Sequence, residues 1–325
     1  MKIGIPDDYA NVVDSLQCFG QLDGHDVTIW NDAERDVDIL AERFRDIEAL
    51  VLLRERTQLP AALICRLPKL RLITLNGPHP NVDVEACTGN GTLICVGHGR
   101  ISYATAELTW GLVLAGMRSI PQQMARLRAG GWQSELGTGL RDRTLGVLGY
   151  GKVGSVVASY GRAFGMKVLV WSRDGGLAAA EAAGHTPCPN RRVLFEQADV
   201  LSLHVRYTKE TAGIVTADDL AAMKPTSLIV NTSRSGLIAP GALLEALKCG
   251  RPGRAAVDVY ETEPSHSEPL LALSNVVATP HLGYFERDQI EAYFGDQFHR
   301  VLAYVDGRPI DVENPDALAG MKGFA

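Results

Sequence analysis

The sequence lacks a strong excess of charge and any concentrated block of one sign. Its 325 residues include 32 basic and 38 acidic side chains, which gives a formal net charge of -6 at pH 7. Because these charges are dispersed, they form no broad basic surface for nucleic acid or for an anionic membrane. We therefore expect no nucleic-acid partner.

Long apolar runs are also missing. No run reaches the roughly 18 residues that indicate a transmembrane helix, and the amino terminus, MKIGIPDDYA, has no secretory apolar core before its acidic pair. We expect no membrane association and a cytoplasmic location.

Cysteine is scarce and shows no metal-binding pattern. The six cysteines form no Cys-x-x-Cys pair and have no histidine at the spacing of zinc ligands. We interpret them as reduced thiols of the core, and we predict neither disulfides nor a metal site.

The sequence does contain enough apolar material for two domains, since 46% of its residues are hydrophobic. The first hundred residues alternate β-like runs with amphipathic stretches, which predicts a parallel sheet with helices on both faces. The predicted strands span 2–5, 26–30, 49–53, 70–75 and 92–96. No phosphate-binding glycine loop follows any of them, so we interpret residues 1–100 as a substrate domain.

A second α/β pattern follows and predicts a doubly wound nucleotide-binding domain over residues 101–285. Residues 103–117 have helical periodicity and lead to the next strand through an irregular connection that contains Pro121, Gly130 and Gly131. Further strands are predicted at 167–171, 199–204, 227–231, 255–260 and 275–280. A long helix over 285–305 could return the chain to the first domain, which residues 286–325 would complete.

The most informative stretch is TLGVLGYGKVG at 144–154, where an apolar strand breaks at three glycines and continues with helical spacing. Gly149 permits a tight turn, Gly151 lets a pyrophosphate approach the backbone, and Gly154 lets the helix pack closely on the strand. The helix N-terminus supplies N–H donors for the phosphates. The stretch therefore predicts a dinucleotide site.

Polar residues follow three of the predicted strands, at the edge where doubly wound sheets bind ligands. Arg234 follows SLIVN, Glu263 follows AAVDVY and His281 follows NVVATP. In a hydride-transfer site, the arginine would hold a substrate carboxylate, the imidazole would exchange the hydroxyl proton, and the glutamate would orient the imidazolium. Taken singly, Arg234 could be a surface residue, Glu263 could cap a turn, and His281 could be an ordinary hydrogen-bonded polar residue. Their joint placement at strand ends favours a catalytic triad.

With these motifs the chain resembles the D-isomer-specific 2-hydroxyacid dehydrogenase family. The resemblance runs through LPKLRLI, TAELTW, LGVLGYGKVG, MKPTSLIVNTSR, AVDVYETEP and TPHLGY. It implies an NAD(P)-dependent dehydrogenase of 2-hydroxy acids, or 2-oxoacid reductase, with a Rossmann-type domain and a flavodoxin-like substrate domain. It also implies a homodimer formed through the nucleotide-binding domains, and it places the catalytic residues on Arg234, Glu263 and His281.

The resemblance implies contact residues as well. Asp258 matches the family position whose acidic side chain binds the carboxamide of the nicotinamide. Other cofactor-binding positions fall on Thr105, Gly149, Tyr150, Gly151, Lys152, Val153, Gly154, Ser172, Arg173, His204 and Thr232. Arg54 and His79 fall in the substrate-contacting segments of the first domain, although Arg54 is equally explained as a solvated charge.

The chain departs from the family pattern near the site. Ser235 stands where a glycine usually follows the catalytic arginine, and Pro78 and Pro80 replace part of a glycine-rich substrate loop. Because proline lacks an N–H group, these two residues remove two donors that would face the substrate carboxylate.

The position after the strand at 167–171 bears on the choice of cofactor. An acidic residue there would bind the adenosine ribose and exclude a 2′-phosphate, but the chain has Ser172, Arg173 and Asp174. Because the repelling charge is missing at Ser172 and Arg173 can bind phosphate, we favour NADP(H) over NAD(H). In the alternative, Arg173 lies along the adenine and Asp174 reaches the ribose of NAD(H).

Two other functions stay open at this stage. A dinucleotide-sensing binding protein, as in the related transcriptional corepressors, would carry the same triad, and a degenerate family member would bind cofactor with little turnover. Formate dehydrogenases share the fold but have glutamine at the position of Glu263, so this carboxylate argues against that activity.

Overall fold

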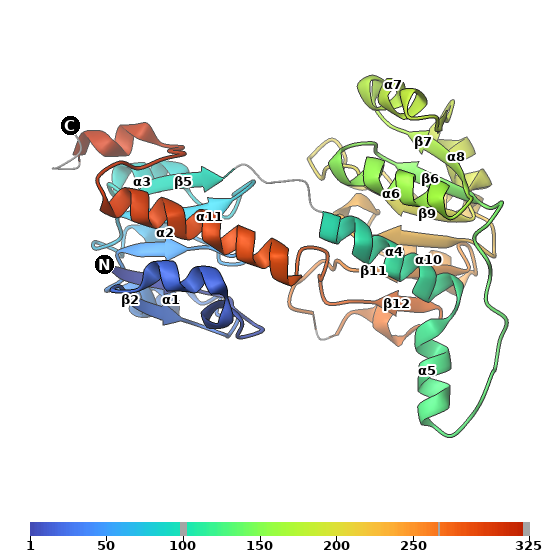
Figure 1. Cartoon of the computed structure of the whole chain (residues 1–325), viewed down its shortest axis with the longest axis horizontal. Coiled ribbons are helices and arrows are strands. Elements are labelled where there is room, and N and C mark those ends of the chain that lie inside the picture. The colour runs from blue at the N-terminus through green and yellow to red at the C-terminus, as the bar shows by residue number, and fades with distance from the viewer. Residues whose placement is uncertain (98–102, 266, 321–325) are drawn as a thin grey trace. The chain divides into compact units, whose positions relative to one another are not determined.

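The computed structural model describes residues 1–97, 103–265 and 267–320. The chain divides into two compact units (Figure 1): unit 1 comprises Met1–Arg100 and Arg287–Ala325, and unit 2 comprises Ile101–Glu286. The predicted boundary between residues 100 and 101 lies outside the described residues. Among the described residues, no helix is long and apolar enough to cross a membrane.

Unit 1 is built on a five-stranded parallel sheet with the order β2-β1-β3-β4-β5. Its strands are β1 Lys2–Ile5, β2 Asp26–Ile29, β3 Ala49–Val51, β4 Leu72–Asn76 and β5 Leu93–Gly97. The five strands expected from the sequence are therefore present. Their order is that of a flavodoxin-like sheet, as predicted.

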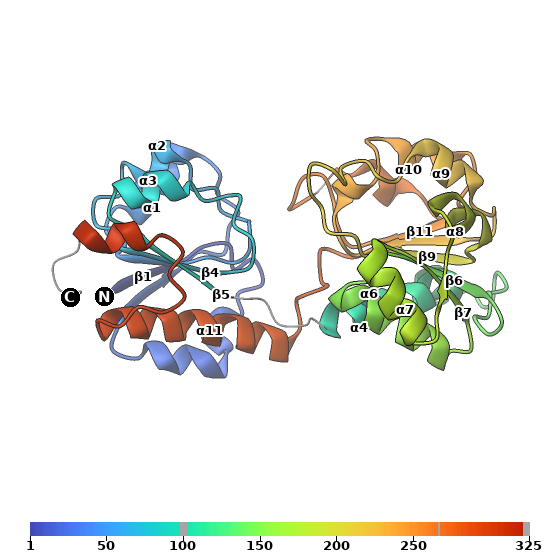
Figure 2. The same cartoon turned by 90° about the horizontal axis from the view of Figure 1, so that it is seen from above.

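Helices cover both faces of this sheet (Figure 2). One face carries α1 Val37–Phe44, α2 Ala61–Ile64 and α3 Val84–Gly89, and the other carries α11 Arg287–Val305 and the 3-10 helix η2 Gln17–Leu22. Two short 3-10 helices, η1 Val13–Ser15 and η5 Pro315–Gly320, complete the unit. The Asp36 carboxylate caps α1 by accepting the N–H groups of Asp38 and Ile39, and Phe298 of α11 packs edge-on against Phe19 of η2.

Unit 2 is built on a seven-stranded parallel sheet with the order β12-β11-β10-β9-β6-β7-β8. Its strands are β6 Thr144–Leu148, β7 Lys167–Trp171, β8 Thr186–Pro187, β9 Val200–Leu203, β10 Leu228–Asn231, β11 Arg254–Val257 and β12 Val276–Ala278. The strand order reverses between β6 and β9, which is where doubly wound sheets bind their ligands. The predicted Rossmann-type sheet is confirmed.

Two helical layers enclose the sheet of unit 2. One layer contains α4 Tyr103–Met117, α6 Lys152–Ala163 and α7 Asp174–Ala182, and the other contains α8 Arg191–Gln197, α9 Ala217–Ala222 and α10 Ala242–Lys248. The 3-10 helices η3 Ser235–Leu237 and η4 Pro269–Ala272 lie in the loops after β10 and β11. The predicted helix at 103–117 coincides with α4.

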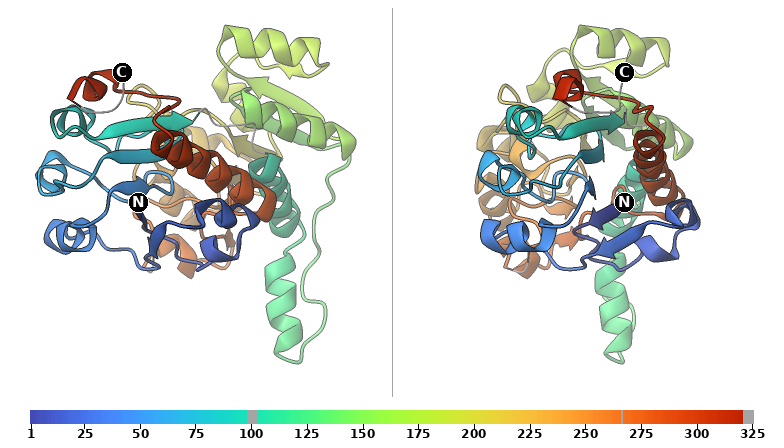
Figure 3. Two further views of the ribbon diagram at one scale, coloured as in Figure 1. Left: turned by 60° about the vertical axis from the view of Figure 1, so that its left-hand side comes forward. Right: turned by 90° about the vertical axis from the view of Figure 1, so that its left-hand side faces the viewer.

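The connection after α4 differs from the sequence-based expectation because it contains a helix, α5 Ile120–Arg128. Pro121 does not break this helix, since it occupies the first turn, where a backbone N–H has no helical partner. The helix ends just before Gly130, whose φ is +80°. Figure 3 shows α5 projecting from the rest of unit 2, and each of its residues is at least partly exposed.

The cysteines also differ in part from expectation. All six lie in the described residues and are unpaired, and Cys87, Cys95 and Cys188 are buried. The prediction of core thiols is wrong for Cys65 and Cys249, which are exposed because they follow the last turns of the short helices α2 and α10.

Candidate active site

The glycine loop of unit 2 joins β6 to α6, and its geometry requires glycine at two positions. Gly149 has a φ of +95°, and a Cβ added there would lie 2.7 Å from the backbone carbonyl oxygen of His204. A Cβ added at Gly154 would lie 2.2 Å from the carbonyl oxygen of Gly149. At Gly151, the N-cap of α6, an added Cβ would meet no described atom within 4 Å. The loop therefore fits a pyrophosphate close to the backbone at the start of α6.

The residues that follow β7 lie beside this loop. The Tyr150 N–H donates to Ser172 Oγ at 3.2 Å, so the serine hydroxyl ties the end of β7 to the glycine loop. Arg173 is exposed and precedes α7 as its N-cap residue. The side chain of Asp174, the alternative ribose partner, lies outside what the structure describes.

The other cofactor positions implied by the family resemblance are spread over neighbouring strand ends and helix starts. Lys152 and Val153 begin α6. His204 follows β9, with its Nε2 2.8 Å from Ser202 Oγ. Burial lowers the pKa of His204 to about 4, so this ring is neutral at pH 7. Thr232 follows β10, and its hydroxyl lies 2.8 Å from that of Thr109 on α4.

Glu263 and His281 form a close pair at the ends of β11 and β12. His281 Nδ1 lies 2.5 Å from Glu263 Oε2, and Glu263 Oε1 accepts the Tyr260 N–H at 3.0 Å. Burial alone would raise the pKa of Glu263, but the hydrogen bond and charge of His281, the Tyr260 N–H and the charge of Arg234 lower it overall. Glu263 is therefore ionised at neutral pH, and an ionised carboxylate at this distance stabilises the protonated imidazole.

The segment that carries His281 has an unusual backbone. His281 has a φ of +55°, in the left-handed region that few residues other than glycine adopt. Such a conformation costs on the order of 1–3 kcal/mol and persists only where its surroundings hold it. Asp258, which is fully buried after β11, accepts hydrogen bonds from Thr279 on one side of His281 and from Leu282 and Gly283 on the other.

Arg234 follows β10 and is half-buried. Its guanidinium donates to the Ser233 carbonyl at 2.8 Å, and its own carbonyl accepts from Asn231 Nδ2 at 2.9 Å. The next residue, Ser235, donates through its hydroxyl to the Tyr260 carbonyl at 2.9 Å. The serine that departs from the family pattern therefore links the loop of Arg234 to the loop that leads to Glu263.

The two candidate substrate contacts of the first domain belong to unit 1. Arg54 follows β3 with a φ of +59°; its N–H donates to the Tyr293 hydroxyl at 2.8 Å, and its Nε lies 4.0 Å from a carboxylate oxygen of Glu55. His79 lies in the loop after β4, with its Nδ1 3.5 Å from the Gly77 carbonyl oxygen. Both residues therefore lie at the carboxyl end of their own sheet.

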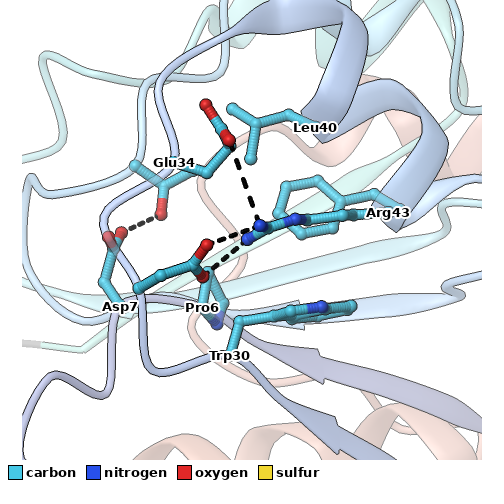
Figure 4. Close-up of a pocket in the computed structure, with 9 residues that line it drawn as sticks. Pro6, Asp7, Trp30, Glu34, Leu40 and Arg43 are labelled. Carbon is cyan, nitrogen blue, oxygen red and sulfur yellow. Dashed lines mark hydrogen bonds and ion pairs between the residues drawn. The ribbon is translucent and has the colours of Figure 1, made fainter.

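A pocket in unit 1 near the ends of β1 and β2 is a weaker candidate (Figure 4). Arg43 lies across it, with Nη1 2.6 Å from one Asp32 oxygen and Nη2 4.0 Å from a Glu34 oxygen. At its other side, the Thr57 hydroxyl donates to the buried Asp7 carboxylate. Because these polar groups are already paired with one another, we do not assign a ligand to this pocket.

Sequence reasoning gave no role to two residues that hold the Glu263 and His281 loops. Thr279 donates to Asp258 at 2.6 Å, and the Tyr260 hydroxyl donates to the Thr279 carbonyl at 2.8 Å. Tyr260 is the last residue of the predicted strand 255–260 and Thr279 is the next to last of 275–280, so they precede Glu263 and His281 by three and two residues. Their place at the ends of predicted strands is the sequence feature that could have identified them.

Comparison with known proteins places the chain in a family. Residues 110–283 match the model for the D-isomer specific 2-hydroxyacid dehydrogenase, NAD binding domain. Glyoxylate reductase of Thermococcus litoralis is 32% identical over 306 residues, which cover 90% of this chain and 92% of that protein. D-3-phosphoglycerate dehydrogenase of Methanocaldococcus jannaschii is 39% identical over 247 residues, which cover 75% of this chain and 47% of that protein.

Solved structures agree with this result. An oxidoreductase from Ralstonia solanacearum has a TM-score of 0.94 and 45% identity, with 98% of each chain covered. Phosphoglycerate oxidoreductase from Vibrio cholerae has a TM-score of 0.91 and 44% identity, covering 94% of this chain and 99% of that one. The matched domain binds NAD(P), and the predicted chemistry at a CH–OH group is confirmed at the level of the family. The chain belongs to the D-isomer-specific 2-hydroxyacid dehydrogenase family, whose members interconvert 2-hydroxy acids and 2-oxoacids.

Proposed function

We propose that the chain reduces small 2-oxoacids to D-2-hydroxy acids with NADPH, and that Arg234, Glu263 and His281 carry the reaction. The observation that supports this most directly is the 2.5 Å contact between His281 and Glu263. This pair follows β11 and β12, while the glycine loop follows β6 at the same edge of the same parallel sheet.

The bound nicotinamide supplies the hydride, and the protein supplies binding and proton transfer. Arg234 binds the substrate carboxylate through two parallel N–H donors and polarises the neighbouring carbonyl. Protonated His281 gives its proton to the oxygen that becomes the hydroxyl. Glu263, in contact with His281 Nδ1, fixes the orientation of the ring. In the direction of oxidation, neutral His281 accepts the proton.

The named relatives differ in substrate, since one is named for glyoxylate and another for D-3-phosphoglycerate. We would assay glyoxylate, hydroxypyruvate, pyruvate and bulkier 2-oxoacids with each reduced cofactor, and D-3-phosphoglycerate with each oxidised one. Turnover of at least one small 2-oxoacid supports the proposed function. Binding of reduced cofactor without turnover of any compound would favour the dinucleotide-sensing alternative.

The preference for NADPH is proposed from the residues after β7. The exposed Arg173 can pair with an adenosine 2′-phosphate, and Ser172 carries no charge that would repel it. Charge-assisted contacts of about 1.5–3 kcal/mol should favour NADPH over NADH by roughly 10- to 100-fold. Arg173→Ala should remove most of this preference, and Ser172→Asp should reverse it, since aspartate would repel the phosphate and bind the free ribose hydroxyls.

Fluorescence titration of both reduced cofactors against wild type and the two variants measures this preference. Arg192→Ala, which removes an exposed arginine on α8, is the matched control and should leave both affinities unchanged. Equal binding of NADH and NADPH by the wild type would contradict the NADPH assignment and make Asp174 the better candidate for the ribose partner.

We also propose a homodimer in which α5 and the segment after it pack against a second copy of the chain. Four large apolar side chains here are strongly exposed: Met124 (46%), Leu127 (57%), Trp132 (72%) and Leu136 (94%). Leu114 and Ile120 extend the same apolar surface beside Met124 and Leu127. Exposed apolar side chains gathered on one surface, as these are around Met124 and Leu127, are typical of protein interfaces.

Introducing two negative charges on this apolar surface by substitution should prevent the dimer from forming. Met124→Glu/Leu127→Glu would bury unpaired carboxylates in the interface, so the mass measured by light scattering should fall from that of a dimer to about 35 kDa. Ile39→Glu, at a 46% exposed apolar residue of unit 1, is the control and should leave the mass unchanged. A wild-type chain that is monomeric at micromolar concentration would contradict this proposal.

We also propose a cytoplasmic location, because the six cysteines, all within the described residues, are unpaired. Reduced thiols are typical of the cytosol. Fractionation of native cells tests this proposal. Recovery of the protein outside the cytosolic fraction would contradict it.

A further inference from the structure

The loop that follows β9, residues 204–213 and here called the β9 loop, lies against the glycine loop. A Cβ added at Gly149 would lie 2.7 Å from the carbonyl oxygen of His204 and 2.8 Å from the backbone nitrogen of Val205. The His204 N–H also donates to the Leu148 carbonyl at 2.7 Å, which extends the pairing of β9 with β6. The β9 loop therefore begins in contact with the turn of the glycine loop.

Arg206, the third residue of the β9 loop, has a backbone that is held by its neighbours. The hydroxyl of Thr211 donates to the Arg206 carbonyl at 2.7 Å and accepts the Thr208 N–H at 2.7 Å. The ring of Tyr207 packs on Gly236 in the loop after β10, where an added Cβ would lie 2.8 Å from the ring. Arg206 thus lies in the chain between a contact with the glycine loop and a contact with the loop after β10.

The side chain of Arg206 is exposed. In the described part of the chain, no hydrogen bond or ion pair joins its guanidinium to another residue, and the same holds for the exposed Arg173. β9 and β7 are the two neighbours of β6 in the sheet, so Arg206 and Arg173 follow the strands on either side of the strand that leads into the glycine loop. Two unpaired guanidinium groups therefore flank the predicted phosphate site.

We propose that Arg206 binds the pyrophosphate of the dinucleotide, whereas Arg173 binds the 2′-phosphate that only NADP(H) carries. This inference rests on the glycine loop as the pyrophosphate site of the proposed function, but it holds for either cofactor. The N–H groups at the start of α6 offer only partial charges to the pyrophosphate, which is negatively charged on each phosphate. A guanidinium adds a full charge and donors that match phosphate oxygens.

Fluorescence titration of NADH and NADPH separates the two arginines. Arg206→Ala should weaken both cofactors by the same factor, roughly 10-fold, because a charge-assisted contact to a phosphate that both contain is lost. Arg173→Ala should weaken NADPH alone. Lys209→Ala is the matched control, since it removes another exposed cation from the β9 loop, and it should leave both affinities unchanged.

Two other replacements identify what the Arg206 side chain contacts. Arg206→Lys keeps the charge and should recover part of the affinity that Arg206→Ala loses, whereas Arg206→Phe keeps only a flat apolar surface and should recover none. The loss in Arg206→Ala should also shrink in about 1 M salt, where the Debye length is about 3 Å and exposed charges are screened.

Unchanged affinity for both cofactors in Arg206→Ala would overturn the inference. A loss confined to NADPH would assign Arg206 to the 2′-phosphate, and recovery by Arg206→Phe but not by Arg206→Lys would assign it to the adenine ring. Either of these results would overturn the inference as well. Failure of the wild type to bind NADH or NADPH would instead contradict the proposed function.

Discussion

Replacing His281 by alanine is expected to lower turnover of the 2-oxoacid by roughly 100- to 10,000-fold, the usual scale for a positioned acid or base. Alanine cannot give a proton to the developing hydroxyl, and the ionised Glu263, 2.5 Å from the imidazole in the wild type, loses the group that it stabilises. The glycine loop lies at a different strand and should keep its affinity for the cofactor. Steady-state reduction and fluorescence titration of NADPH measure the two quantities separately.

His299→Ala is the control for this experiment, because His299 is exposed on α11 of unit 1. It should retain wild-type turnover. If a correctly folded His281→Ala variant also reduced the substrate at the wild-type rate, His281 would have no part in the chemistry.

Replacing Arg234 by lysine is expected to lower kcat/KM for the oxoacid about 100-fold, with a higher KM and a lower kcat. A guanidinium presents two parallel donors to a planar carboxylate, whereas an ammonium group on a flexible stem is a point charge. Loss of one charge-assisted hydrogen bond of about 1.5–3 kcal/mol accounts for most of this change. Initial rates over a range of oxoacid concentrations at saturating cofactor measure both parameters.

Arg191→Lys is the matched control for Arg234→Lys, since the half-buried Arg191 also pairs with a carboxylate, that of the buried Asp219 in unit 2. It should change neither parameter. Retention of both parameters in Arg234→Lys would show that another group, such as Arg54, anchors the carboxylate.

Much of the fold could be predicted because its signals are local. The strands 2–5 and 167–171 are each a lysine followed by an unbroken run without polar side chains, and β1 and β7 coincide with them in full. Gly149 and Gly154 are required by contacts within a few residues of the turn or with the adjacent strand, so a short motif could reveal them. The alternation of strands and helices predicted two parallel sheets covered by helices, and both sheets are present.

What the sequence could not reveal depends on contacts between distant residues. α5 was missed because a proline and a glycine pair indicate a break, whereas Pro121 fits the first turn of a helix. The clamp of Asp258 on Thr279 joins residues 21 positions apart, and only the register of β11 against β12 brings them together. Likewise, the sequence shows Ser235 only as a departure from the family pattern, whereas in the structure its hydroxyl donates to the carbonyl of Tyr260, 25 positions away.

The most direct test of the account is to combine wild-type protein, NADPH and a 2-oxoacid with a prochiral carbonyl, such as pyruvate or hydroxypyruvate. Cofactor oxidation and the enantiomers of the product would be measured in the same reaction. The account predicts one molecule of D-2-hydroxy acid for each NADPH oxidised. Tight binding of NADPH with no hydroxy acid formed from either compound, or formation of the L enantiomer, would contradict it.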